Sequence, residues 1–568
     1  MKTRFVAGIS LLLIFLLSAS SLADDPGTWW VFLKTRQTDR ATRQEVLNGL
    51  SEKARERRLR TLGQVVLESD LPPSYSSVRQ VSSMVTQVLT VSRWLNAVSV
   101  VATREQIEAV AKLPDVREIR RVSVQQEIRP LPVAPSRSSS TISVSNDLAS
   151  IYGSAAAQIH QIKVDSVHMM GYTGNGVTVA FLDSGFPRIK THNAFKHLDI
   201  VDTLNAVTSS SADPNPASFY GDSHGSLVVS TVVASDTGKM VGVAPNISVL
   251  LARTEDNTGG ITTEYPEEEI FWVNGLEWAE AHGADLVSTS LGYRWWAEGG
   301  GYLNSQMDGN TAVTTIAADA AAARGLLVVA SAGNNSGSSP VADTTINAPA
   351  DGDSVLAVGA VDANGARAYF SSQGPTADGR IKPDVVALGL HAALVNVAND
   401  TDYASANGTS FSAPLVAGVV ALMLEANPYL QPMDIITILH ETSSHAADPS
   451  DSVGYGLVDA KAAVLAALDL FGSTEEPTTS QPEQFNLSQV WPNPTNGLVR
   501  MRLETNDSGS GELALYDLLG RLVMRRSLVL TRGANSLELT LDGVASGVYL
   551  VRVDQRGSSQ VRRITLLR

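Results

Sequence analysis

Short apolar runs alternate with longer helical stretches through the centre of the chain. The runs Val177–Leu182 and Ile247–Ala252 have the length of strands and are apolar except for one hydroxyl residue each, as strands covered on both faces are. The stretches Glu267–His282 and Ala312–Arg324 are long enough for helices. Alternating strands and helices predict a mostly parallel central sheet between two layers of helices. We therefore expect a three-layer α/β domain over residues 150–471.

The pattern changes on both sides of this region. Residues 24–128 begin with the apolar run Trp29–Leu33, continue into a charged helical stretch at Arg43–Leu62, and end with the alternating segment Val116–Val124. This mixture predicts a small α+β domain. Residues 486–568 contain short alternating segments separated by turn sequences, which predict a β-sandwich.

Three segments lack the pattern of a folded domain. Residues 1–23 carry a basic start, an apolar run and a small-residue cleavage site, which are the three parts of a secretory signal peptide. Residues 129–149 are rich in Pro and Ser, residues 472–485 are polar, and both are expected to be linkers. Exposed linkers are preferred sites of proteolysis, so we expect a maturation cut in the linker at residues 129–149. No later stretch is long and apolar enough to span a membrane, which predicts no integral membrane segment after signal removal.

Charge is distributed unevenly along a chain whose net charge is −15. Residues 151–485 carry 12 Lys and Arg against 37 Asp and Glu, whereas residues 24–150 carry 18 against 14. The acidic centre disfavours nucleic acid as a partner. Three interpretations of its carboxylates stay open: a solvated surface, a docking face for the basic segment, or a structural calcium site whose ligands are unknown. The chain has no cysteine, which excludes disulfides and thiolate chemistry.

Three residues combine the side chains needed for nucleophilic catalysis. Asp183 directly follows an apolar strand, and His224 and Ser410 each open an apolar helical stretch. A serine hydroxyl becomes a nucleophile when a histidine removes its proton, and a buried carboxylate orients that histidine. The order Asp, His, Ser differs from that of α/β-hydrolases and chymotrypsin-like enzymes. We interpret Ser410 as nucleophile, His224 as general base and acid, and Asp183 as the orienting carboxylate.

A fourth segment offers a donor for the oxyanion of the reaction. Asn334 lies in a glycine turn after the apolar run Leu326–Ala330, and its amide can donate to the developing charge beside the Ser410 backbone amide. Each of these short segments is weak evidence alone, but Gly408–Pro414 (Gly-Thr-Ser-Phe-Ser-Ala-Pro) is far more specific. Four such segments in one α/β domain favour an enzyme.

These motifs resemble those of the subtilase family of serine proteases, over roughly residues 150–470. Further motifs of the resemblance are Ser288–Gly292, Lys382–Ala387 and Gly454–Ala460. The resemblance implies a subtilisin-like fold, an edge strand that pairs with substrate backbone, and a pocket wall for a substrate side chain. The implied substrate-binding residues are Ser290, Leu291 and Gly292 in the edge strand, and Ala332, Gly333 and Asn335 in the pocket wall.

The flanking regions also resemble parts of secreted precursors. Residues 24–128 resemble the inhibitory propeptide of subtilases. Residues 486–568 resemble the C-terminal sorting domain of type IX secretion, which implies export through the periplasm of a Gram-negative bacterium to the medium or the cell surface.

Together these expectations describe a secreted serine endopeptidase that hydrolyses peptide bonds through an acyl-enzyme and requires no cofactor. The expected partners are protein or peptide substrates, its own propeptide and the type IX secretion machinery. The alternative is a catalytically inactive subtilase-fold protein with a binding or adhesion role in the cell envelope. A complete triad with Asn334 argues against the alternative, because binding alone would not need all four residues.

Overall fold

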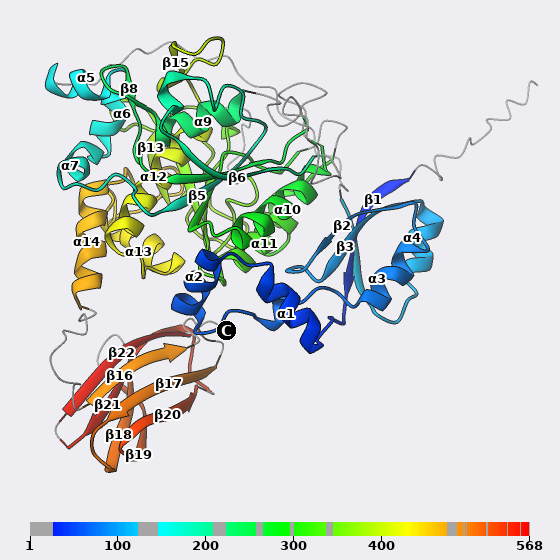
Figure 1. Cartoon of the computed structure of the whole chain (residues 1–568), viewed down its shortest axis with the longest axis vertical. Coiled ribbons are helices and arrows are strands. Elements are labelled where there is room, and N and C mark those ends of the chain that lie inside the picture. Colours follow the sequence, from blue (N-terminus) through cyan, green and yellow to red (C-terminus); the bar gives the residue numbers. More distant parts are fainter. Residues whose placement is uncertain are drawn as a thin grey trace, which may run out of the picture. The chain divides into compact units, whose positions relative to one another are not determined.

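The computed structural model shows three folded parts joined along the chain (Figure 1). It describes residues 26–122, 146–207, 223–256, 265–295, 300–336, 345–473, 485–491, 495, 497–517, 521–541, 543–556 and 558–566. The expected signal peptide at residues 1–23 lies outside these ranges, as do most of the two expected linkers at residues 129–149 and 472–485.

The central part is built on a seven-stranded sheet in the order β13-β12-β11-β10-β5-β9-β6, in which neighbouring strands pair in parallel. Its strands are β5 (Thr178–Asp183), β6 (Asp199–Asn205), β9 (Ser248–Arg253), β10 (Leu286–Thr289), β11 (Leu327–Ser331), β12 (Val355–Val361) and β13 (Val385–Leu388). All residues of β5, β10, β11, β12 and β13 are buried, as the apolar runs predict.

Helices cover both faces of this sheet. On one face α12 (Thr409–Ala426) packs against β10 to β13 and between α9 (His224–Val233) and α14 (Ala460–Ser473). On the other face lie α10 (Glu268–Ala281) and α11 (Val313–Ala322), which pack against each other. Alternate residues of β5 serve the two layers: Phe181 belongs to the core that contains α12, whereas Leu182 faces α10 at Gly275. The expected three-layer α/β fold is therefore confirmed.

Helix α12 lies at the centre of the central domain's hydrophobic core. Among the described residues it alone has the length and apolar composition of a membrane span, but nearly all of it is buried within the protein. Its sequence is apolar on every side because α9, α14 and the sheet surround it.

The N-terminal part contains a four-stranded antiparallel sheet in the order β2-β3-β1-β4. Its elements are β1 (Gly27–Leu33), β2 (Gln87–Ser92), β3 (Ala97–Ala102) and β4 (Val116–Arg121), with helices α3 (Tyr75–Ser82) and α4 (Arg104–Val110). At the start of α4, the Thr103 hydroxyl accepts from the Gln106 amide and the Gln106 side chain accepts from the Thr103 amide, as a capping box.

The single helix expected at Arg43–Leu62 is wrong. The structure has two helices there, α1 (Arg40–Asn48) and α2 (Glu52–Leu62). Gly49 ends the first and the Ser51 side chain caps the second by accepting from the Ala54 amide. Residues 38–71, which contain both helices, belong to the same compact unit as the central domain.

The C-terminal part is a β-sandwich of two antiparallel sheets, β16-β17-β20 and β19-β18-β21-β22. Its strands are β16 (Phe485–Trp491), β17 (Leu498–Thr505), β18 (Gly509–Asp517), β19 (Leu522–Leu530), β20 (Gly533–Thr540), β21 (Gly547–Gln555) and β22 (Ser558–Leu566). Along β17 Val499, Met501 and Leu503 are buried while Arg500 and Arg502 are exposed, so the period of two expected from the sequence holds.

A buried carboxyl group lies in the first turn of α10. The hydroxyl of Tyr302 donates to both carboxyl oxygens of Glu269, at 2.8 and 2.9 Å. Burial raises the pKa of Glu269 from its ordinary value of 4.5 to about 8, and the nearby Asp351 carboxylate adds to the rise against the opposing hydrogen bond from Tyr302. The folded protein therefore keeps this proton at pH values where the unfolded chain has lost it.

This difference predicts that Glu269 weakens the fold as pH rises from about 5 to 8. Each pH unit in that window costs up to about 1 kcal/mol, because only the unfolded state gains by releasing the proton. Glu269→Gln removes the titration and keeps an acceptor for Tyr302. We expect a higher unfolding temperature than wild type at pH 8 and a similar one at pH 5, measured by calorimetry. The exposed Glu441→Gln is the matched control, and equal pH slopes for Glu269→Gln and wild type would contradict the prediction.

Candidate active site

Asp183 and His224 are brought together at the carboxyl edge of the central sheet. Asp183 is the last residue of β5 and His224 is the first residue of α9. The imidazole Nδ1 lies 2.8 Å from Asp183 Oδ1, and the same oxygen accepts from the Ser184 amide at 2.7 Å. Asp183 is buried, while the His224 side chain is 30% exposed and can be reached from solvent. A buried carboxylate at Nδ1 fixes the tautomer in which Nε2 can accept a proton.

A glycine permits this close approach. A Cβ on Gly225 would lie 2.4 Å from the Gly185 carbonyl oxygen and 3.0 Å from Asp183 Cβ. Any side chain at this position would push the start of α9 away from the end of β5. Gly225 is therefore required for the close packing of α9 against the end of β5.

Ser410 is the second residue of α12 and lies in the same region. Ser410 is 9% exposed, and its hydroxyl donates to the Ser290 carbonyl oxygen at 3.2 Å. The Ser290 hydroxyl donates in return to the Ser410 carbonyl at 2.7 Å. The neighbouring Phe411 ring lies 5.9 Å from the His224 ring, centroid to centroid. The structure thus brings Asp183, His224 and Ser410 from three elements to one edge of the sheet.

Asn334 follows β11 and is oriented by the residue before Ser410. The Asn334 side-chain oxygen accepts from the Thr409 amide at 2.9 Å and from the Thr409 hydroxyl at 3.0 Å. Since both of these partners donate, the oxygen must face Thr409 and the Asn334 NH₂ group must point elsewhere. Asn334 is exposed, so this NH₂ group is available to a ligand. The sequence did not reveal the part played by Thr409.

The expected substrate-binding residues form two neighbouring segments. Ser290, Leu291 and Gly292 extend the chain beyond β10, and Ala332 and Gly333 extend it beyond β11. Because β10 and β11 pair in parallel, both extensions leave the sheet at the same edge.

Asn347, which belongs to none of the sequence motifs above, contacts both segments. The Asn347 side chain accepts a hydrogen bond from the Asn335 side chain at 2.7 Å. A Cβ would lie 2.7 Å from the Asn347 side chain if it were added to Gly292, and 3.0 Å if it were added to Gly333. Gly333 also has a φ of +109°, which a side chain would strain. The described residues named on this wall are uncharged.

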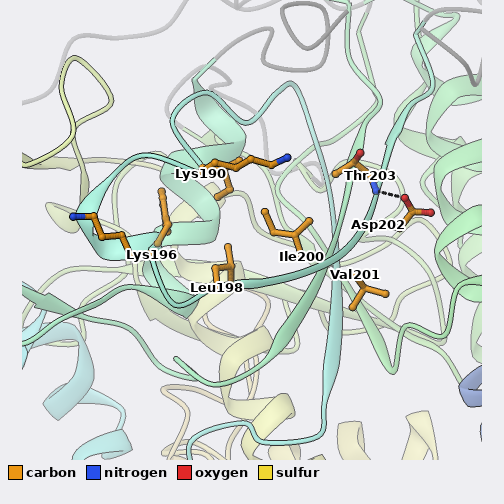
Figure 2. Close-up of a pocket in the computed structure, with 9 residues that line it drawn as sticks. Lys190, Lys196, Leu198, Ile200, Val201, Asp202 and Thr203 are labelled. Carbon is orange, nitrogen blue, oxygen red and sulfur yellow. Dashed lines mark hydrogen bonds between the residues drawn. The ribbon is translucent and has the colours of Figure 1, made fainter. Parts of the chain in front are cut away.

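Two other features of the surface lie apart from these residues. A pocket of about 490 Å³ lies beside the edge strand β6 and is lined by Lys190, Lys196, Leu198, Ile200 and Asp202 among others, without any predicted site residue (Figure 2). Among the described residues, no group of three or more His, Asp or Glu could hold a metal ion. The structural calcium stays a prediction.

Comparison with known proteins identifies the family. The model of the subtilase family matches residues 174–457, that of the Bacteroidota peptidase S8 propeptide domain matches residues 28–140, and that of a secretion system C-terminal sorting domain matches residues 489–566. Subtilisin DY of Bacillus licheniformis is 36% identical over 53% of this chain and 96% of its own length. Subtilisin E of Bacillus subtilis is 32% identical over 54% of this chain and 70% of its own length. A solved protease structure from Pseudoalteromonas arctica is 26% identical over 56% of this chain and 99% of that chain, with a TM-score of 0.42.

A three-layer α/β domain with an Asp, His and Ser at the carboxyl edge of its sheet defines a class of serine hydrolases. The chain belongs to the subtilase family and is a serine endopeptidase made with a propeptide and a C-terminal sorting domain. The last two matches indicate a secreted or cell-surface protein.

Proposed function

We propose that Ser410, His224 and Asp183 carry the peptidase activity, with Asn334 as oxyanion donor. The observation that supports this most is the 2.8 Å contact between His224 Nδ1 and the buried Asp183, in the same region as Ser410 at the start of α12. His224 Nε2 removes the Ser410 proton as the hydroxyl oxygen attacks the scissile carbonyl. The resulting oxyanion is stabilised by the Asn334 NH₂ and the Ser410 amide.

The remaining steps use the same groups. His224 donates its proton to the leaving amine, so the amine departs and an acyl-enzyme on Ser410 Oγ remains. His224 then activates water, which releases the acid and restores the serine. Asp183 stabilises the imidazolium in both halves and stays ionised throughout. The chemistry requires no cofactor.

The substrate is proposed to be a protein or peptide in extended conformation. Its backbone would pair with Ser290, Leu291 and Gly292 in the β-augmentation mode. Ala332, Gly333 and Asn335 would line the pocket for the side chain before the scissile bond, and Asn347 would hold that wall in place. The absence of charge on the described residues of this wall favours uncharged substrate side chains.

The flanking domains are proposed to control where and when the enzyme acts. Residues 24–128 act as the inhibitory propeptide, and residues 486–568 direct export through the type IX machinery of a Gram-negative bacterium. A structural calcium is proposed from the acid excess of the central domain and from the resemblance to subtilases. We propose that Ser410 makes the maturation cut in its own chain, between about residues 125 and 150.

The self-cleavage proposal predicts that Ser410→Ala accumulates an uncut precursor. Removal of the nucleophile lowers turnover by about a million-fold in a related enzyme, so no cut is expected on the time scale of expression. Wild type and variant are expressed in a host without other extracellular proteases, and their N-termini are sequenced. The same mature N-terminus in both would show that another protease makes the cut.

The proposed role of Asn334 predicts a loss in kcat with little change in KM. Asn334→Ala removes one oxyanion donor and is expected to lower kcat by roughly a hundredfold to a thousandfold. Thr409→Val removes one of the two hydrogen bonds that orient Asn334 and is expected to lower kcat by about tenfold, as part of that effect. Thr409→Ser, which keeps the hydroxyl, is the matched control and should stay near wild type. A rise in KM with unchanged kcat for Asn334→Ala would assign this residue to substrate binding instead.

A further inference from the structure

Residues 38–71, here called the docking segment, lie within the propeptide in sequence but fold with the central domain. They comprise α1, α2 and the short helix η1 (Glu68–Asp70), and they fall inside the region matched by the propeptide family model. The segment groups with the central domain as one compact unit, separate from the β1–β4 sheet that precedes and follows it along the chain. This division assigns only the docking segment of the propeptide to the unit of the central domain.

Helix α2 lies against the C-terminal ends of α10 and α11. The Ser51 amide donates to the Ala281 carbonyl at 2.8 Å, and the Arg57 guanidinium donates to the Ala284 carbonyl just beyond α10. The last carbonyls of a helix lack partners within the helix and carry the negative end of its dipole. The docking segment supplies both a hydrogen-bond donor and a positive charge at this end of α10.

A fully buried ion network joins the two pieces of chain. Arg58 makes a bidentate pair with Glu280 of α10, with both N–O distances at 2.8 Å, and also pairs with Asp70 of the docking segment. Arg324, just after α11, donates to Asp70 at 2.7 Å. Arg58, Asp70 and Glu280 are 0% exposed and Arg324 is 2% exposed. Each side therefore contributes one carboxylate that pairs with an arginine of the other side.

Two glycines of the central domain make room for α2. Gly283 has a φ of +91°, and a Cβ there would lie 2.8 Å from the Ser51 hydroxyl. Gly325 has a φ of +78°, and a Cβ there would lie 2.6 Å from the Thr61 methyl group. Both follow helices whose C-terminal ends face the docking segment, so the surface is shaped to receive it.

The contact lies at the edge of the sheet opposite to the active site. At the rim, Lys53 pairs with Asp285 at 2.6 Å and donates to the Thr178 hydroxyl at 2.7 Å. Thr178 is the first residue of β5 and Asp183 is the last. Five steps along a strand separate the two ends by roughly 16 Å. The docking segment therefore binds without entering the region of Ser410.

We propose that the docking segment is a second anchor of the propeptide, which keeps the cleaved propeptide on the enzyme while Ser410 is accessible. The inference rests on the self-cleavage proposed above. Leaving this surface would break the pairs of Arg58 with Glu280 and of Arg324 with Asp70 together, and buried hydrogen-bonded charge pairs act mainly on the rate of dissociation. Release of the propeptide from the active site and its departure from the enzyme are then two separate steps.

The full-length wild-type protein tests the anchor without any substitution. It is allowed to mature, treated with a fluorophosphonate probe that reacts with an accessible active serine, and passed through gel filtration at neutral pH. We expect the labelled enzyme to elute together with a cleaved fragment that contains residues 38–71, identified by mass spectrometry. Labelled enzyme that elutes free of this fragment would overturn the proposal.

A matched pair of variants assigns the retention to the network. Arg58→Ala is expected to speed dissociation of the fragment by roughly a hundredfold, because it removes the bidentate partner of Glu280 and leaves that buried carboxylate with Arg57 alone. Arg60→Ala, an exposed arginine on the same helix, should behave as wild type. If Arg58→Ala does not fold, Arg58→Lys keeps the charge but loses the bidentate geometry and should dissociate faster than wild type. Equal dissociation rates for the folded Arg58 variant and wild type would contradict the proposal.

These outcomes separate the anchor from the proposed catalytic residues. An uncut chain that the probe does not label would show that the self-cleavage proposal has failed. A cut and labelled enzyme that loses its propeptide at the same rate in every variant would leave the catalytic proposal intact and remove the anchor.

Discussion

The parallel pairing of β5, β10 and β11 is the constraint on which the proposed site depends. In a parallel sheet the carboxyl ends of neighbouring strands meet at one edge. Asp183 ends β5, Ser290 follows β10, and Asn334 follows β11, so residues that are 44 to 151 positions apart in the sequence reach the same edge of the sheet. The sheet needs no special feature at this edge beyond its register, because α9 and α12 begin here and bring His224 and Ser410.

The same architecture makes the edge where the strands begin suitable for binding the docking segment. Helices α10 and α11 run back along the sheet, so their C-terminal ends lie near the starts of the strands. The last carbonyls of each helix have no hydrogen-bond partner within the helix. The docking segment provides arginines there, and the buried carboxylates of Asp70 and Glu280 balance them. Burial alone would raise the pKa of Glu280, but Arg57 and Arg58 outweigh it and hold the pKa below its ordinary value, so the carboxylate stays ionised. Catalysis and retention of the propeptide are thereby assigned to opposite ends of the same strands.

Much of the fold could be predicted from the sequence because it is recorded in local patterns. Mostly apolar runs predicted buried parallel strands such as β12, and alternating segments predicted a β-sandwich, whose strand β17 has the expected period of two. The expected strand end at Asp183 agrees with the end of β5. The helix at Arg43–Leu62 was wrong because Gly49 and Ser51 act as an end and a cap within a continuous charged stretch.

The parts that could not be predicted depend on contacts between distant residues. Thr409 and Asn334 are 75 positions apart, and Arg58 and Glu280 are 222 apart. The side chains of Thr409 and Asn347 give no indication in the sequence of a role in the site. An arginine-rich helix usually indicates a solvated surface. Only the folded chain shows that Arg58 is fully buried.

In the proposed mechanism the Asp183 carboxylate orients His224 for proton transfer from Ser410. The most direct test is the rate at which the full-length precursor cuts its own linker after refolding, compared between wild type and Asp183→Asn. Asparagine keeps the shape but favours the wrong imidazole tautomer, so the account predicts a rate lower by roughly ten-thousandfold in a protein with an unchanged unfolding temperature. A folded Asp183→Asn precursor that cuts itself within tenfold of the wild-type rate would contradict the account.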